Sequence, residues 1–143
     1  MKFKLFVPLV LVVVMGSLQA QPYPNKPIKL VVGFTPGGAA DYVARNLSAP
    51  LGQALGQSIV VENKPGAGSS IAADQVAKSA PDGYTVLLAS PSSISVNPAL
   101  NPKLTYKASD LLPVTKVTSS PIVIAAYPGA KLNSIKELIA KAK

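Results

Sequence analysis

A strand-like run, a glycine corner and a helical pattern follow one another directly near the start of the chain. Residues 28–33, Ile-Lys-Leu-Val-Val-Gly, are typical of a buried strand, and a helical pattern begins near Tyr42. Between them lie residues 34–41, Phe-Thr-Pro-Gly-Gly-Ala-Ala-Asp. Because glycine has no Cβ, the backbone of this corner can approach a ligand closely, and the helix dipole behind it favours an anion. The corner therefore predicts an anion site made of backbone amides, which suits a carboxylate.

Strand-like and helix-like segments alternate from residue 28 to residue 89. The segments that we expect are strands at residues 28–34, 58–62 and 84–89, and helices at residues 41–55 and 71–79. Pro50 and Gly52 interrupt the first helix, which predicts a kink or a break near residue 49. Residues 86–88 are apolar, so we expect the third strand to be buried. This alternation favours an α/β domain with a mostly parallel sheet covered by helices.

The pattern becomes less regular after the third predicted strand. Residues 90–110 contain three prolines among serines and asparagines, which predicts an extended loop with one short turn of helix. Residues 112–118 and 122–127 are strand-like. Ser134 and Glu137 form a Ser-x-x-Glu capping box, so we expect a last helix that continues to Lys143.

The first twenty residues have the pattern of a secretory signal peptide. Lys2 and Lys4 give a positive start, an apolar stretch follows, and cleavage is expected near Ala20. An uncleaved N-terminal anchor is the alternative, although the apolar stretch is short for a membrane span. Cleavage would leave residues 21–143 as one domain and lower the formal net charge from +8 to +6, because both lysines are removed.

The composition excludes several classes of function. The sequence contains no histidine and no cysteine, which rules out Ser-His and Cys-His nucleophiles, disulfides, a lipoprotein anchor and zinc sites built on these residues. We expect no cofactor and no metal. Six carboxylates with no obvious pair disfavour an acid–base enzyme. The basic residues are all lysine except Arg45 and are scattered singly, which indicates a solvated surface with mild attraction for anions rather than a nucleic-acid site.

Three loops rich in glycine, serine and threonine follow the three predicted strands, at residues 35–41, 64–70 and 90–93. One such loop is often only a tight turn, but three at the carboxyl ends of parallel strands predict a shared polar pocket. The second loop contains Gly66-x-Gly68, but the third glycine of a dinucleotide fingerprint is absent, which disfavours a nucleotide site. Asp41 would repel an anion, so we expect it to cap the first helix or hold the loop, while Arg45 and Lys64 are candidate cations.

Five motifs in order resemble the substrate-binding proteins of tripartite tricarboxylate transporters, the Bug family. These motifs are Tyr-Pro-Asn-Lys-Pro-Ile-Lys at 23–29, the corner at 34–41, Val-Glu-Asn-Lys-Pro-Gly-Ala-Gly at 61–68, Ala-Pro-Asp-Gly-Tyr-Thr at 80–85 and Val-Asn-Pro-Ala-Leu at 96–100. The resemblance covers residues 22–143. It implies a fold like that of the type II periplasmic binding proteins, with the first of two domains present and the second missing.

The resemblance also implies a function and a set of site residues. It implies a periplasmic solute receptor, monomeric and without enzymatic activity, that captures a small organic anion for the membrane permease subunits of a transporter. A di- or tricarboxylate, an acidic amino acid or an aromatic carboxylate would suit the pocket. Asp41 matches a family aspartate that we assign to loop support, and Ser69 and Ala72 stand where glycine is common. The implied ligand-binding residues are Thr35, Pro36, Gly37, Gly38, Ala39, Gly68, Ser69, Ser70, Ala89, Ser90, Ser92 and Ser93.

The chain departs from the family in its length. The resemblance implies a protein about twice as long, in which a hinge joins two such domains. We therefore expect this chain to be an N-terminal fragment, a truncated gene product or part of a longer protein. Closure of two domains sequesters the ligand in receptors of this kind, so this chain alone should bind weakly or not at all. The alternatives are a secreted single-domain interaction protein, in which the loops are only turns, and a fragment without ligand binding; an enzyme ranks third.

Overall fold

The computed structural model describes residues 22–121 and 123–142. The predicted signal peptide at residues 1–20 lies outside the described residues, as does Lys143. The chain divides after Leu111 into two units, and each is described by itself. No helix in the described ranges is long and apolar enough to cross a membrane.

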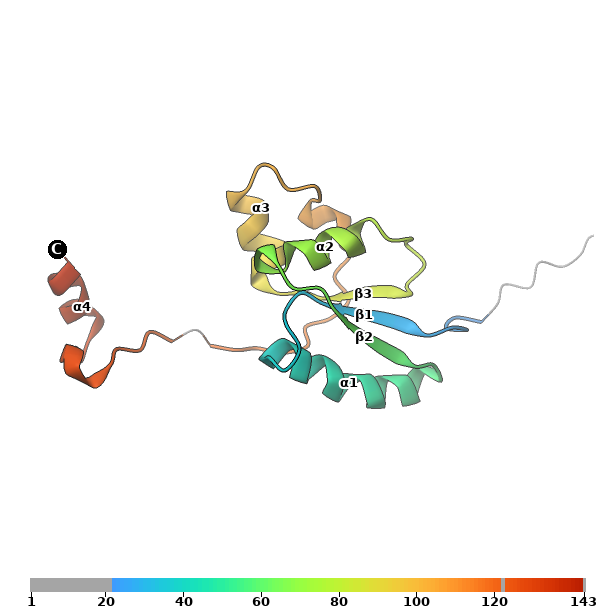
Figure 1. Cartoon of the computed structure of the whole chain (residues 1–143), viewed down its shortest axis with the longest axis horizontal. Helices are drawn as coiled ribbons and strands as arrows, with labels where there is room; N and C mark the ends of the chain where they lie inside the picture. Colours follow the sequence, from blue (N-terminus) through green and yellow to red (C-terminus); the bar gives the residue numbers. More distant parts are fainter. Residues whose placement is uncertain (1–21, 122, 143) are drawn as a thin grey trace, which may run out of the picture. The chain divides into compact units, whose positions relative to one another are not determined.

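The first unit is built on a parallel three-stranded sheet (Figure 1). Its strands lie in the order β2-β1-β3, and their bounds are Ile28–Val32 for β1, Ile59–Asn63 for β2 and Thr85–Leu88 for β3. Leu30 of the central strand pairs with Val61 on one side and with Val86 on the other. Since all three strands run in the same direction, their carboxyl ends meet at one edge. The predicted parallel α/β sheet is confirmed.

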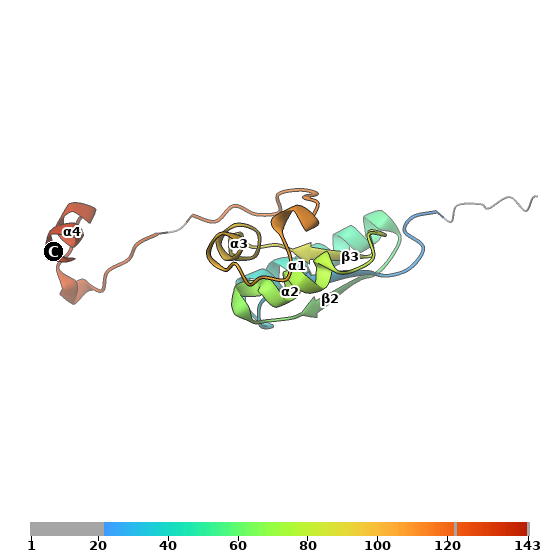
Figure 2. The ribbon, with the colours of Figure 1, turned by 90° about the horizontal axis from the view of Figure 1, so that it is seen from above.

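Helices lie on the two opposite faces of this sheet (Figures 1 and 2). Helix α1 (Ala39–Leu55) places Ala44 against Leu30 and Val32, and these three buried residues form the core on one face. Helix α2 (Ser70–Ala77) covers the other face and buries Ala72 and Ala73 completely. The prediction that β3 is buried is wrong. All of its residues are only half-buried, because in the described unit β3 is an edge strand.

The break predicted as one outcome near residue 49 does not occur. Helix α1 continues through Pro50 and ends at Gly56, which adopts a left-handed conformation with φ of +67°. Pro50 is exposed, so water can solvate the backbone carbonyl that loses its helical hydrogen bond. Helix α1 therefore continues past the proline to Leu55.

Residues 90–110 are more helical than the predicted extended loop. They contain η2 (Ser92–Val96), α3 (Asn97–Leu100) and η3 (Ala108–Asp110). Pro98 lies in the first turn of α3, where its missing N–H costs no helical hydrogen bond. Proline therefore begins a helix here, whereas the sequence pattern predicted a loop.

The second unit, residues 112–142 apart from residue 122, contains η4 (Pro128–Ala130) and α4 (Ile135–Ala142). The Glu137 N–H donates to Ser134 Oγ at 3.2 Å, and Glu137 Oε2 accepts from the Asn133 N–H at 2.7 Å, so the predicted helix start is confirmed. The predicted strands at 112–118 and 122–127 do not form among the described residues of these ranges. A strand needs a partner that completes its hydrogen bonds, and none pairs with these residues in the described unit.

Candidate functional site

The three predicted loops begin side by side at the carboxyl edge of the sheet, because β1, β2 and β3 are parallel. The Lys64 N–H donates to Val32 O at 2.8 Å, which joins the second loop to the end of the central strand. Thr35, Pro36 and Gly37 of the first loop are exposed. Their backbone is therefore open to solvent at this edge.

Asp41 connects the first loop to the rest of the edge. It is 3% exposed and lies in the first turn of α1. Its Oδ2 accepts hydrogen bonds from Arg45 Nε at 2.8 Å and from the Gly37 N–H at 2.9 Å, and its Oδ1 accepts one from Asn63 Nδ2 at 2.9 Å. Bonds from Arg45, Gly37 and Asn63 hold the pKa of the Asp41 carboxyl well below its usual range. The group is an ionised internal support, and it already occupies the Gly37 amide that was predicted to face a ligand.

Asn63 completes this network and was not singled out from the sequence. Besides its bond to Asp41, its Nδ2 donates to Phe34 O at 3.0 Å, and its Oδ1 accepts from Arg45 Nη2 at 3.2 Å. The side chain thus links the last residue of β2 to the first loop and to α1. One feature of the sequence could have indicated this role: Asn63 has a side-chain amide, which both donates and accepts hydrogen bonds, and it lies where a strand meets a glycine loop.

The candidate cations are both paired with carboxylates. Arg45 binds Asp41, and Lys64 Nζ lies 3.0 Å from Glu62 Oε1. Glu62 Oε2 also lies 2.7 Å from Lys29 Nζ, and the two lysines lower the pKa of Glu62 to about 2. These pairs neutralise the charged side chains beside the loops, so a ligand would meet mainly backbone and hydroxyl groups.

The second loop has an unusual backbone. Ala67, Gly68 and Ser69 have φ values of +47°, +59° and +70°, and α2 starts at the next residue. The side chain of Ser69 is buried against Gly33, where an added Cβ would collide with Ser69 Oγ. Close approach of the first two loops therefore depends on the missing side chain at Gly33.

Asn97 ties the second loop to the segment that follows β3, and it too was not assigned a role from the sequence. Its Nδ2 lies within hydrogen-bond distance of Ala67 O at 3.1 Å, Gly68 O at 3.0 Å and Ser70 Oγ at 2.7 Å. A Cβ on Gly68 would approach the same Nδ2 to 3.0 Å. Its inclusion in the motif at residues 96–100 was the only sign in the sequence that it had a role.

In the third loop, one of the predicted ligand-binding residues is buried. Ser93 is fully buried, and its Oγ accepts from the Ser90 N–H at 3.1 Å and donates to Ser90 O at 3.0 Å. The Tyr106 hydroxyl, itself buried, donates to Ser93 O and lies 3.5 Å from Ser70 Oγ. Ala89 is exposed, while Ser90 and Ser92 are half-buried. The structure thus brings the three predicted loops to one edge. The Ser93 hydroxyl, however, bonds the backbone of its own loop.

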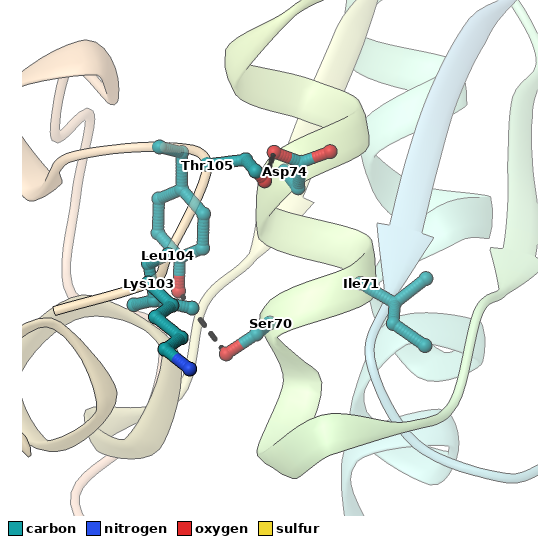
Figure 3. Close-up of a pocket in the computed structure, with 7 residues that line it drawn as sticks. Ser70, Ile71, Asp74, Lys103, Leu104 and Thr105 are labelled. Carbon is teal, nitrogen blue, oxygen red and sulfur yellow. Dashed lines mark hydrogen bonds between the residues drawn. The ribbon is translucent and has the colours of Figure 1, made fainter. Parts of the chain in front are cut away.

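A hollow of about 210 Å³ lies beside α2 (Figure 3). Figure 3 shows Ser70 and Asp74 of α2 with the segment that carries Lys103 and Thr105, whose Oγ1 donates to Asp74 Oδ1. Of the predicted ligand-binding residues, only Ser70 lines it. A shallower hollow of about 640 Å³ between α1 and the start of β2 has none of them in its lining. Within the described ranges, no group of three metal-ligating side chains occurs.

Comparison with known proteins identifies relatives over most of the chain. Residues 43–143 match the family described as tripartite tricarboxylate transporter family receptor. The chain is 45% identical over 130 residues to Protein BugT of Bordetella pertussis, a match that covers 90% of this chain and 40% of BugT. The chain therefore spans about two fifths of the length of this curated relative.

Two solved structures have a similar fold over about three fifths of this chain. MatC from Rhodopseudomonas palustris with bound malate is 41% identical, with a TM-score of 0.57 over 60% of this chain and 29% of MatC. A second R. palustris protein, with adipate, is 36% identical, with a TM-score of 0.58 over 62% of this chain and 29% of that protein. The fold class is therefore that of the periplasmic binding proteins, of which this chain covers a part.

Proposed function

This chain belongs to the family of tripartite tricarboxylate transporter receptors, and we propose that it forms the part of a periplasmic receptor that first grips a small carboxylate. The observation that carries the proposal is the convergence of three glycine- and serine-rich loops at the carboxyl edge of one parallel sheet. Ligands of open α/β sheets bind at this edge. The malate and adipate in two structural relatives support a carboxylate as the ligand class.

The electrostatics of the edge suit an anion held by amides and hydroxyls. Asp41 and Glu62 are neutralised by Arg45, Lys29 and Lys64, so no unpaired carboxylate among them would repel the ligand. Helices α1 and α2 start directly after the first two loops, so the dipoles of both helices favour an anion there. We propose Thr35, Gly38, Ala39, Gly68, Ser69, Ser70, Ser90 and Ser92 as the contact set, with Pro36, Gly37, Ala89 and Ser93 shaping the loops.

The family supports a proposal about the export and the partners of the chain. We propose that the chain is exported to the periplasm by residues 1–20, acts as a monomer and delivers its ligand to membrane permease subunits without catalysing a reaction. The absence of histidine and cysteine from the sequence supports a binding role, because it removes the commonest nucleophile systems. In the complete receptor, a second domain would close over the three loops and sequester the ligand.

The test is carboxylate binding by the complete protein as encoded by its gene. Malate, adipate, succinate and citrate would each be titrated by calorimetry, and the melting temperature would be followed in parallel. A ligand at 100 times its Kd adds about 2.7 kcal/mol to the stability of the protein that binds it, so a true ligand should raise Tm clearly. Residues 21–143 alone should bind the same ligand far more weakly. Failure of all four ligands, together with capture of a protein partner by the exposed loops, would favour the interaction module instead.

A further inference from the structure

The Ser69 hydroxyl is an exception among the polar groups at the carboxyl edge. Ser69 is 1% exposed, and its Oγ has no hydrogen-bond partner among the residues that the structure describes. The side chain lies against Gly33, the first residue after the central strand. Buried hydroxyl groups are nearly always hydrogen-bonded, so this exception calls for an explanation.

The backbone of Ser69 adds a second exception. Its φ of +70° lies in the left-handed region, which glycine adopts far more easily than serine. A glycine at this position would satisfy the backbone and would leave no hydroxyl unpaired. Serine therefore destabilises the free protein in two ways, through its left-handed backbone and through its unpaired hydroxyl. Both are explained if the hydroxyl makes a hydrogen bond in the ligand complex.

We propose that Ser69 is a specificity-determining residue whose hydroxyl donates a hydrogen bond to the bound carboxylate. This inference rests on the proposed function of the site and deepens it. Ser69 immediately precedes α2, an eight-residue helix whose N-terminus favours an anion, so one oxygen of an anion bound there would accept from the hydroxyl. Rotation about χ1 and about the Cβ–Oγ bond redirects the donor without moving the backbone.

The neighbouring charges permit this contact. Asp41, the carboxylate that supports the first loop, has both oxygens occupied by Arg45, Gly37 and Asn63. The Ser69 hydroxyl is a donor left without an acceptor, and a carboxylate supplies acceptors only. A site that presents a buried donor rejects ligands that lack a matching acceptor, because the donor would then stay unpaired.

The decisive variant is Ser69→Ala in the complete protein, because it keeps the Cβ and the backbone constraint and removes only the hydroxyl. The matched control is Ala67→Gly, which relieves a positive φ in the same loop and leaves the hydroxyl in place. Malate, adipate, succinate and citrate would be titrated separately by calorimetry, and Tm would be measured without ligand. We expect Ser69→Ala to weaken the tightest of the four at least about tenfold, as a lost hydrogen bond to a charged group does. Its ligand-free Tm should equal or exceed that of the wild type, and Ala67→Gly should change the affinity less than about twofold.

Two results would overturn the inference while leaving the proposed function intact. One is binding by Ser69→Ala within twofold of the wild type. The other is a clear loss of ligand-free Tm in Ser69→Ala, which would show that the hydroxyl has a structural partner in the free protein. If the wild type binds none of the four carboxylates, the proposed function fails, and the role of Ser69 fails with it.

Discussion

Asp41 Oδ2 accepts a 2.9 Å hydrogen bond from the backbone N–H of Gly37, four residues earlier in the chain. The acceptor lies in the first turn of α1 and the donor lies in the loop that precedes it, so the helix fixes the shape of its own entrance. Gly37 has a φ of +82°, and the carboxylate holds this left-handed residue in place. The charge of Asp41 therefore stabilises the loop, and the other amides and hydroxyl groups of the loop are available to a ligand.

Replacing Asp41 by asparagine tests this support. Asparagine keeps the size of the side chain but loses the charge, so Arg45 loses its ion pair and the bond to Gly37 weakens. We expect Asp41→Asn to lower Tm by a few degrees and to weaken carboxylate binding, because the first loop becomes less ordered. Calorimetry with malate and thermal unfolding would measure the two effects. Stronger binding by the variant would contradict the assignment, because it would mean that the Asp41 charge repels the ligand.

The Lys29–Glu62–Lys64 cluster predicts a pH dependence of stability. The two lysines lower the pKa of Glu62 from its ordinary 4.5 to about 2 in the folded chain. A carboxyl with a lowered pKa contributes stability that is present above pH 4.5 and is lost as the pH falls toward 2. Glu62→Gln should therefore have a lower Tm than the wild type at pH 7, by a small amount because the pairs are partly exposed. The Tm difference between the two proteins should shrink below pH 4.5 and vanish below pH 2. A difference that stays constant from pH 7 to pH 2 would refute this origin.

Asn97 predicts a coupling between the second loop and the segment after β3. Asn97→Ala leaves Ala67 O, Gly68 O and Ser70 Oγ without the amide donor, and we expect a loss of about 1–3 kcal/mol in the free energy of unfolding. Asn97→Asp should cost more, because it places a carboxylate against two carbonyl oxygens. Urea unfolding would measure both. Asn46→Ala is the control, since the exposed Asn46 amide makes one local bond to Tyr42 O. Equal losses from Asn97→Ala and Asn46→Ala would refute the coupling.

The parts of the fold that were predicted correctly depend on local patterns. Apolar runs and the turns between them were enough to identify β1, β2 and β3, and the capping box located the start of α4. The continuity of α1 could not be predicted in this way, because the cost of Pro50 depends on whether its side of the helix faces water. The strands expected after residue 111 failed for a related reason, since pairing depends on a partner that the local pattern does not contain.

In the candidate site, too, features with a local pattern were predicted and features that depend on distant contacts were not. Its three loops were predicted from residue types, and the structure brings them to one edge. Asn63 and Asn97 were missed because their roles arise from contacts with residues 29 and 30 positions away, Phe34 and Ala67. The bond from the buried Tyr106 hydroxyl to the Ser93 carbonyl likewise joins residues 13 positions apart, which meet only in the folded chain. Hydrogen bonds between distant residues leave no spacing that a single sequence reveals.

Gly33 and Ser69 provide a test of how the first two loops fit together. An added Cβ at Gly33 would collide with Ser69 Oγ, so Gly33→Ala must displace the second loop, and we expect it to cost about 1–3 kcal/mol as overpacking does. Ser69→Gly removes the obstructing side chain and the positive-φ constraint, so the double variant should recover most of the lost stability. Urea unfolding of the wild type, both single variants and the double variant forms a mutant cycle, and the coupling should be at least about 0.5 kcal/mol. Gly38→Ala is a matched control, since its added Cβ would meet its nearest neighbour at 3.5 Å, an ordinary contact. Additive losses in the cycle would show that Ser69 does not lie against Gly33 in solution, and the inference about its hydroxyl would lose its structural basis.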